Sequence, residues 1–182
     1  RNDVLESSRG SILADDGRYL AFSIPEYVMC MDCMQADSAL FYGNVDELGR
    51  KLSEFYKDKS AKQYANALRE RRSSGRHYFV LNRRLLTYQE MKEVSSFPIL
   101  EKGNRVGGLI IEKQDHREYP YGSLAYRVLG QLKNNQAEES LVGIEGKYDT
   151  LLRGTDGVQP MKLTEHNEWI PDTDKDITEP ID

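Results

Sequence analysis

The stretch from Arg117 to Gly130 is the sequence feature that most constrains the fold. It reads REYPYGSLAYRVLG, in which Pro120 and Gly122 interrupt an extended run. Ser123 is suited to cap a following helix, and Gly130 is suited to end it. The apolar residues of that short helix are expected at Leu124, Ala125, Val128 and Leu129. The stretch therefore predicts a corner at which a strand gives way to a helix.

Two other segments join this corner in one resemblance. The first is Arg9-Gly10-Ser11-Ile12, followed by Gly17, Leu20 and Ala21, and the second is Gly143-Ile144-Glu145, followed by Tyr148, Leu151, Gly154 and Gly157. In their order and spacing, the three segments resemble the motifs of the N-terminal, non-catalytic domain of class B penicillin-binding proteins. The division-specific type, which crosslinks septal peptidoglycan, is the most similar, and the elongation-specific type is the alternative.

The resemblance implies a function as well as a fold. It implies a pedestal or "dimerisation" domain without a cofactor, which positions a transpeptidase domain expected beyond Asp182. It also implies a transmembrane anchor before Arg1 and a place on the periplasmic side of the bacterial inner membrane. The implied partners are a polytopic membrane glycosyltransferase, other division or elongation proteins and the protein's own transpeptidase domain. The dimerisation label implies a homodimer, although the sequence shows no heptad pattern.

Composition limits the other classes of function. The 182 residues are 38% hydrophobic, which suits a modest core, and the formal net charge is −5. Eleven tyrosines occur without a basic-aromatic motif, so nucleic-acid binding is not expected. A glycan-binding module would need these tyrosines to line a groove.

Strands are predicted near both ends of the chain. Asp16-Gly17 between apolar runs predicts a hairpin, and Tyr27–Asp32 is expected to be a separate strand after Pro25. Residues 1–8 are expected to be an extended linker, and the tail from Asp172 an extended connection. The remaining expected elements are strands at Val106–Lys113, Met161–Leu163 and Glu168–Ile170, and a helix at Glu145–Leu152 that ends at Gly154.

Helices are predicted in the middle of the chain, where three pairs have capping-box spacing. The pairs are Asn44 with Glu47, Ser60 with Gln63, and Thr87 with Glu90. A short strand is expected at His77–Leu81, and the third helix is expected to end before Pro98. The predicted fold class is α+β, with an elongated β-rich stem from residues 1–41 and 98–182 and an inserted helical head at 42–97.

Catalytic motifs of a penicillin-reactive domain do not occur in this sequence. Such a domain needs Ser-x-x-Lys, Ser-x-Asn and Lys-Thr-Gly or Lys-Ser-Gly. Cys30 and Cys33 leave a stand-alone thiol-redox enzyme as an alternative, although residues three apart on a strand lie about 10 Å from each other. Asp115-His116 could be half of a catalytic pair in such an enzyme. His77, His116 and His166 are too scattered to predict a zinc site.

The matched motifs predict a structural junction in place of an active site. Arg9, Arg117 and Glu145 are expected to meet as a charge-paired contact that holds the stem in register. The other predicted junction residues are Gly10, Gly17, Pro120, Gly122, Gly130, Gly154 and Gly157. A second candidate site is a docking patch for an anionic partner surface, although the favoured interpretation of these cations is a solvated helix end at the negative pole of the helix dipole. Its residues are Arg69, Arg71, Arg72, Arg76, Arg83 and Arg84.

Overall fold

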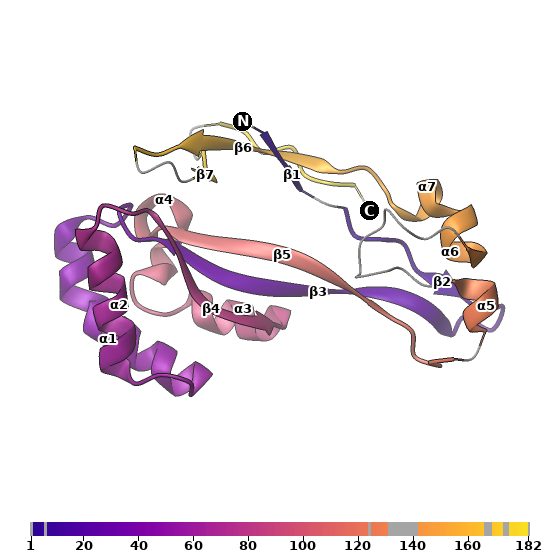
Figure 1. Ribbon diagram of the computed structural model, residues 1–182, viewed down its shortest axis with the longest axis horizontal. Helices are drawn as coiled ribbons and strands as arrows, with labels where there is room; N and C mark the ends of the chain where they lie inside the picture. Colours follow the sequence, from indigo (N-terminus) through magenta and orange to yellow (C-terminus); the bar gives the residue numbers. More distant parts are fainter. Residues whose placement is uncertain are drawn as a thin grey trace. The chain divides into compact units, whose positions relative to one another are not determined.

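The computed structural model describes residues 2–5, 7–123, 125–130, 142–165, 169–172 and 175–181 (Figure 1). Helices and sheets are combined within these residues, which confirms the predicted α+β class. The strands are β1 (Asn2–Leu5), β2 (Ile12–Leu13), β3 (Tyr19–Asp32), β4 (Tyr78–Leu86), β5 (Leu109–Glu118), β6 (Gly157–Leu163) and β7 (Trp169–Pro171). In one sheet β3 pairs with β2, β4 and β5, and in the other β6 lies between β1 and β7.

The contacts within the chain divide it into two compact units. Unit 1 comprises Tyr27–Lys113 and Pro160–Asp176, whereas unit 2 comprises Asn2–Glu26, Gln114–Gln159 and Ile177–Asp182. The predicted boundaries of the stem and the head stay a prediction. The long helices all belong to unit 1, and they are α1 (Ser38–Tyr56), α2 (Ala61–Ser73) and α3 (Tyr88–Ser95).

Helix α1 begins earlier than its predicted cap at Asn44. Asp37 is the residue that caps it, since its Oδ1 accepts a hydrogen bond from the backbone N–H of Leu40 at 2.7 Å. The Asn44 side chain lies inside the helix and donates to the carbonyl of Leu40. The capping boxes predicted for the next two helices are confirmed, at Ser60 for α2 and at Thr87 for α3.

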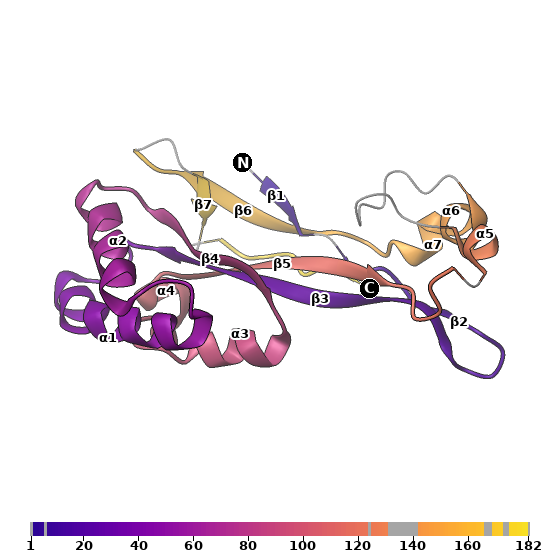
Figure 2. The same cartoon turned by 60° about the horizontal axis from the view of Figure 1, so that its bottom comes forward.

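Helices α1 and α2 pack closely because a glycine lies at their contact (Figure 2). A Cβ atom on Gly49 would lie 2.6 Å from the carbonyl oxygen of Ala61, so a larger residue would separate the helices. The apolar faces that meet here are buried, at Val45, Leu48, Leu52 and Tyr56 of α1 and at Tyr64, Ala65 and Leu68 of α2. Phe55 and Ala61 are half-buried.

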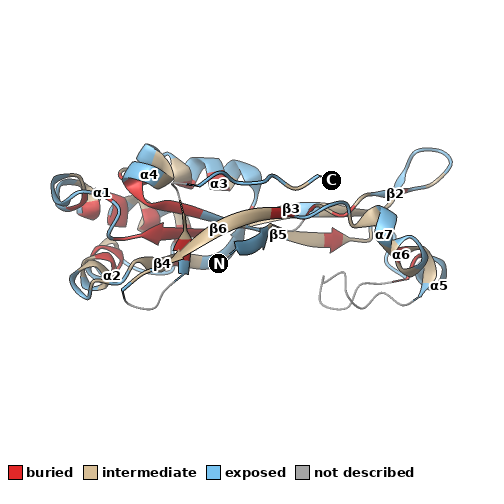
Figure 3. Ribbon diagram, turned by 90° about the horizontal axis from the view of Figure 1, so that it is seen from above, coloured by how far each residue is buried: buried red, intermediate tan, exposed pale blue. Residues whose placement is uncertain are grey.

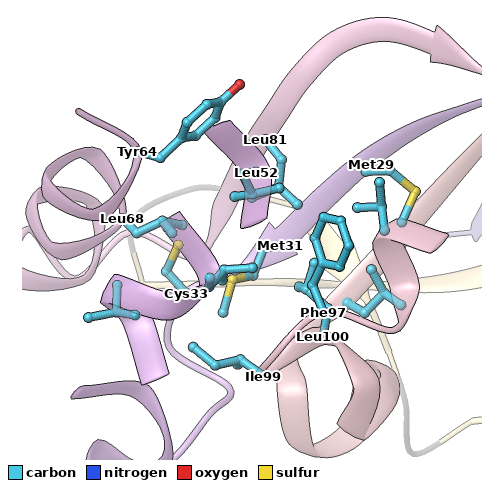
Figure 4. Packing of buried hydrophobic residues seen from close by; sticks show 14 of the residues in the cluster. Met29, Met31, Cys33, Leu52, Tyr64, Leu68, Leu81, Phe97, Ile99 and Leu100 are labelled. Carbon is cyan, nitrogen blue, oxygen red and sulfur yellow. The ribbon is translucent and has the colours of Figure 1, made fainter. Parts of the chain in front are cut away.

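The largest core of the molecule lies in unit 1, between these helices and one face of the sheet (Figure 4). Side chains alternate along β3, so Met29 and Met31 face this core, while Val28 and Cys30 pack with Ile110 in a separate cluster. The helices are buried on the side of this core and exposed on the other, as Figure 3 shows.

Several predicted strands differ in extent from those observed. The hairpin at Gly17 is confirmed, but β3 then continues through Pro25 as one strand. Pro25 is tolerated because it lies between Ala21, which pairs with β2, and Tyr27, which pairs with β4. Val106 belongs to a short helix, α4 (Gly103–Gly107), which follows the 3-10 turn η1 (Leu100–Lys102).

The corner after β5 differs from its prediction. Ala125, with φ of 59°, precedes the one-turn helix α5 (Tyr126–Leu129), and the Ser123 side chain does not cap that helix. Of the predicted apolar residues that the structure describes, Leu129 alone is buried, and Val128 is 60% exposed. The predicted helix at Glu145–Leu152 is instead two short helices, α6 (Gly143–Lys147) and α7 (Asp149–Leu152).

The chain termini in unit 2 are held by pairing. Bridges join Thr178 to Val158 and Ile181 to Thr155, so the tail folds back where an extended connection was predicted. Within the predicted linker, residues 2–5 form strand β1. Leu124, His166 and Glu168, which were assigned to predicted elements or sites, lie outside the described residues.

Candidate functional site

A buried cluster of charges in unit 2, here called the charged junction, consists of Arg9, Arg117, Glu145 and Asp149. Glu145 lies on α6, and its side chain is fully buried. Its Oε2 accepts a hydrogen bond from Nε of Arg9 at 2.7 Å, and its Oε1 accepts one from Nε of Arg117 at 2.9 Å. Each carboxylate oxygen is therefore bound by a different guanidinium group. Hydrogen bonds between two charged groups are stronger than those between neutral groups.

Further N–H groups of both arginines donate within the same cluster. Nη1 of Arg9 donates to Oδ1 of Asp149 at 2.7 Å, and Nη2 donates to the backbone carbonyl of Glu145 at 2.8 Å. Nη1 of Arg117 donates to the carbonyl of Arg9 at 3.2 Å and to Oγ of Ser23 at 3.1 Å. Two cations thus face two carboxylates, which offsets the desolvation of charges in a site where both arginines are more than nine-tenths buried.

The charged junction joins segments that are far apart in the sequence. Arg9 precedes β2, Arg117 is near the end of β5, and Glu145 with Asp149 comes from α6 and α7. Alternation along β5 turns Arg117 inward, toward Ser23 on the neighbouring strand β3. The backbone N–H of Gly10 also donates to the carbonyl of Leu152 at 2.7 Å. The N-terminal segment is therefore held both by the Arg9 side chain and by the backbone.

A second layer of polar contacts surrounds the charged junction. The backbone N–H of Ser7 donates to Oδ1 of Asp156 at 2.9 Å, and its hydroxyl donates to the carbonyl of Arg153. Nη2 of Arg153 donates to Oδ2 of Asp149 at 3.0 Å, which connects this layer to the junction. Sequence reasoning did not identify Ser7, Asp149 or Asp156. The one sequence signal for Asp149 was its position four residues after Glu145, because side chains at that spacing lie on the same face of a helix.

The predicted glycines and proline occupy different environments. Pro120 lies in the exposed turn after β5, and Gly10 has room for a Cβ, since the nearest atoms would be 3.6 Å away. By contrast, a Cβ on Gly157 would lie 2.3 Å from the carbonyl oxygen of Thr178 in the tail. Of the predicted junction glycines, Gly17, Gly122, Gly130 and Gly154 have positive φ.

Comparison with known families identifies this arrangement. Residues 4–182 match the family model described as the Penicillin-binding Protein dimerisation domain. The chain belongs to this family. Its three motif segments, chosen from the sequence, are therefore parts of a penicillin-binding protein dimerisation domain, and the charged junction is where they meet.

Solved structures show the same fold. Penicillin Binding Protein 2X from Streptococcus thermophilus has a TM-score of 0.74 and 19% identity, and the match covers 100% of this chain and 28% of that one. A peptidoglycan synthetase from Bifidobacterium adolescentis has a TM-score of 0.58 and 22% identity, covering 100% of this chain and 34% of that one. The chain thus spans about a third or less of these relatives. No curated protein sequence matches it.

The six arginines of the predicted patch have different roles in this dimerisation domain. Four are held by neighbours: Arg69 pairs with Asp46 at 2.6 Å, Arg71 donates to the carbonyl of Tyr78, Arg72 donates to those of Cys33 and Ala36, and Arg84 pairs with Glu90. Arg76 and Arg83 are exposed, and within the described residues no side-chain hydrogen bond or ion pair holds either guanidinium group.

The cysteines of the domain are buried and lie in different apolar clusters. Cys30 is on β3 and Cys33 follows it, and no disulfide joins these two described residues. Burial raises the pKa of the Cys30 thiol to about 11, although the neighbouring hydroxyl of Tyr78 opposes that shift. A redox-active thiol requires the opposite shift, so the environment of Cys30 disfavours the thiol-redox alternative.

Slow alkylation of both cysteines is therefore expected. Iodoacetamide at pH 8 should leave Cys30 and Cys33 unmodified in the folded domain and modify both in urea, as measured by mass spectrometry. Rapid modification of Cys30 in the folded domain, at the rate seen in urea, would contradict this description of the thiol.

The two described histidines, His77 and His116, have different partners. Nδ1 of His77 lies 2.9 Å from Oδ1 of the buried Asp32, and Nε2 of His116 lies 3.4 Å from Oε2 of Glu118. Among the described residues, no group of three or more His, Cys, Asp or Glu side chains is placed to hold a metal ion. None of the helices described is both long and apolar enough to cross a membrane.

Proposed function

We propose that this chain is the non-catalytic pedestal of a class B penicillin-binding protein, a D,D-transpeptidase that crosslinks peptidoglycan. The observation that carries the proposal is the family match over residues 4–182. The relatives of the same fold are about three times longer than this chain, which supports a separate catalytic part. We assign the Ser-x-x-Lys chemistry to that part, beyond Asp182, because the sequence of this domain lacks it.

The polar contacts that surround the charged junction support a mechanical role. The segment at Ser7 is fastened to Arg153 and Asp156, and the tail pairs with Thr155 at Ile181. The N-terminal and C-terminal segments of unit 2 are thus attached to one short loop. A pedestal needs such a fixed base if it is to position a transpeptidase domain relative to a membrane anchor that precedes Arg1, on the periplasmic side of the inner membrane.

The proposed partners follow from this position in the cell envelope. We assign the domain to septal cell division, with a polytopic membrane glycosyltransferase and other division proteins as partners. The elongation-specific type is the alternative, because both types share the three motifs. The apolar side chains of Leu151 and Ile181 are 79% and 69% exposed, which suits contact with the protein's own transpeptidase domain or with a second copy in a homodimer.

Sequencing the gene on both sides of this segment tests the proposal. We expect one stretch of about 20 apolar residues upstream, and Ser-x-x-Lys, Ser-x-Asn and Lys-[Ser/Thr]-Gly downstream. Fluorescent penicillin should then label the full-length protein and leave residues 1–182 unlabelled. A stop codon directly after Asp182 in the natural gene would overturn the pedestal assignment and favour a free-standing module.

A further inference from the structure

Two adjoining hollows in unit 1 form a groove between helix α2 and strand β4, here called the α2–β4 groove. Each hollow has a volume of about 430 Å³, and both are lined by Arg71 and Phe79. The first also touches Glu70 and Arg76, near the C-terminal end of α2. The second extends along β4 as far as Arg83 and is also lined by Asp58 and Lys59.

The α2–β4 groove follows the edge of a sheet. Consecutive residues from Tyr78 to Arg83 line the second hollow. Because side chains alternate between the two faces of a strand, such continuous lining indicates a hollow along the strand's edge. Among the described strands β4 pairs only with β3, so its other edge has no strand beside it. The Arg71 guanidinium donates to the carbonyl of Tyr78 from this side, which shows that backbone groups of this edge accept donors there.

The charges around the groove favour an anionic occupant. Four cations line it, Lys59, Arg71, Arg76 and Arg83, against the carboxylates of Asp58 and Glu70. Asp58 already accepts hydrogen bonds from the Tyr64 hydroxyl at 2.6 Å and from the Asn82 amide at 2.9 Å. The exposed guanidinium groups of Arg76 and Arg83 stand on either side of Phe79 in the sequence. This cationic groove is local, since the chain as a whole carries a formal net charge of −5.

We propose that the α2–β4 groove binds an extended, acidic peptide segment of a partner protein. The segment lies along the open edge of β4, which is a recurring mode of peptide recognition. An apolar residue of the peptide packs on the half-buried ring of Phe79, and flanking carboxylates pair with Arg76 and Arg83. The inference rests on the proposed role as an interaction domain, and it adds the location of the site and the chemistry of its partner.

Selection from a random peptide library tests the groove. A display library of random 12-residue peptides is selected against residues 1–182, and the affinity of the enriched peptides is measured by fluorescence anisotropy. We expect enrichment of peptides in which an apolar residue is flanked by Asp or Glu. The double variant Arg76→Glu/Arg83→Glu should weaken their binding by about tenfold or more, and added salt should weaken binding to the unmodified chain.

A matched control separates the groove from general electrostatics. The variant Lys62→Glu/Lys92→Glu makes the same change in net charge at residues that do not line the groove, and it should leave peptide affinity unchanged. Equal melting temperatures of the two variants confirm that both fold.

Three results would overturn the proposal. They are enrichment of peptides without acidic residues, equal weakening by both double variants, and self-association of the chain that only Arg76→Glu/Arg83→Glu abolishes. The last would assign the groove to a second copy of this chain. Since the gene sequence and the penicillin labelling do not depend on the groove, failure here is distinguishable from failure of the pedestal assignment.

Discussion

Replacing Glu145 with alanine is expected to lower the free energy of unfolding by about 3–5 kcal/mol. The substitution leaves Arg9 and Arg117 buried without the carboxylate that each contacts through its Nε. Removing this carboxylate is costly because two buried guanidinium groups then face the single remaining carboxylate, that of Asp149. For a chain of this length the melting temperature should fall by roughly 10 °C, which thermal unfolding followed by circular dichroism would detect.

An exposed ion pair provides the control for this prediction. Arg18 and Asp16 approach to 2.6 Å, with side chains that are 69% and 44% exposed. Asp16→Ala should leave the melting temperature unchanged, because solvent screens such a pair. A melting temperature for Glu145→Ala equal to that of Asp16→Ala would mean that the charged junction contributes nothing to stability.

Replacing Gly130 with alanine is the second substitution with a large expected effect, a loss of about 3 kcal/mol. Gly130 ends α5 with φ of 80° and ψ of 179°, a region of backbone conformation that only glycine adopts without strain. A Cβ there would also lie 2.1 Å from the carbonyl oxygen of Val142, so the segment that leads into α6 would have to move. Urea unfolding measures the loss.

Gly122 in the same motif is the matched control for Gly130. It also has positive φ, of 54°, but a Cβ there meets nothing within 4 Å. Gly122→Ala should therefore cost only about 1 kcal/mol, from backbone strain alone. If the two variants lose equal stability, the close approach at Gly130 does not matter and only its conformation does.

Local signals in the sequence predicted much of unit 1. The capping boxes at Ser60 and Thr87 are complete within four residues each, so the sequence contains all the groups that define them. The predicted cap at Asn44 was wrong because Asp37, which precedes the apolar run, accepts the capping hydrogen bond and so starts the helix earlier in the chain. Pro25 did not end the strand because pairing on either side of it belongs to different partners.

The candidate site is built from long-range contacts, which limits how much of it local sequence patterns can predict. Arg9, Arg117 and Glu145 were chosen through the three motif segments, since nothing in the local pattern brings Arg9 to two residues that are more than a hundred positions away from it. Asp149 and Asp156 join the site by contacts with Arg9 and Ser7 across similar separations. The division of the six arginines into held and exposed groups likewise depends on tertiary contacts, which neighbouring residues in the sequence do not reveal.

A double-mutant cycle between Arg117 and Glu145 tests the central claim most directly, namely that the motif residues form one coupled, buried junction. The free energies of unfolding of Arg117→Met, Glu145→Gln and the double variant are compared with that of the unmodified chain. We predict a coupling energy of about 2 kcal/mol, because the two side chains are in direct contact at 2.9 Å and both are buried. A coupling energy near zero would contradict the account, since the two charges would then act independently.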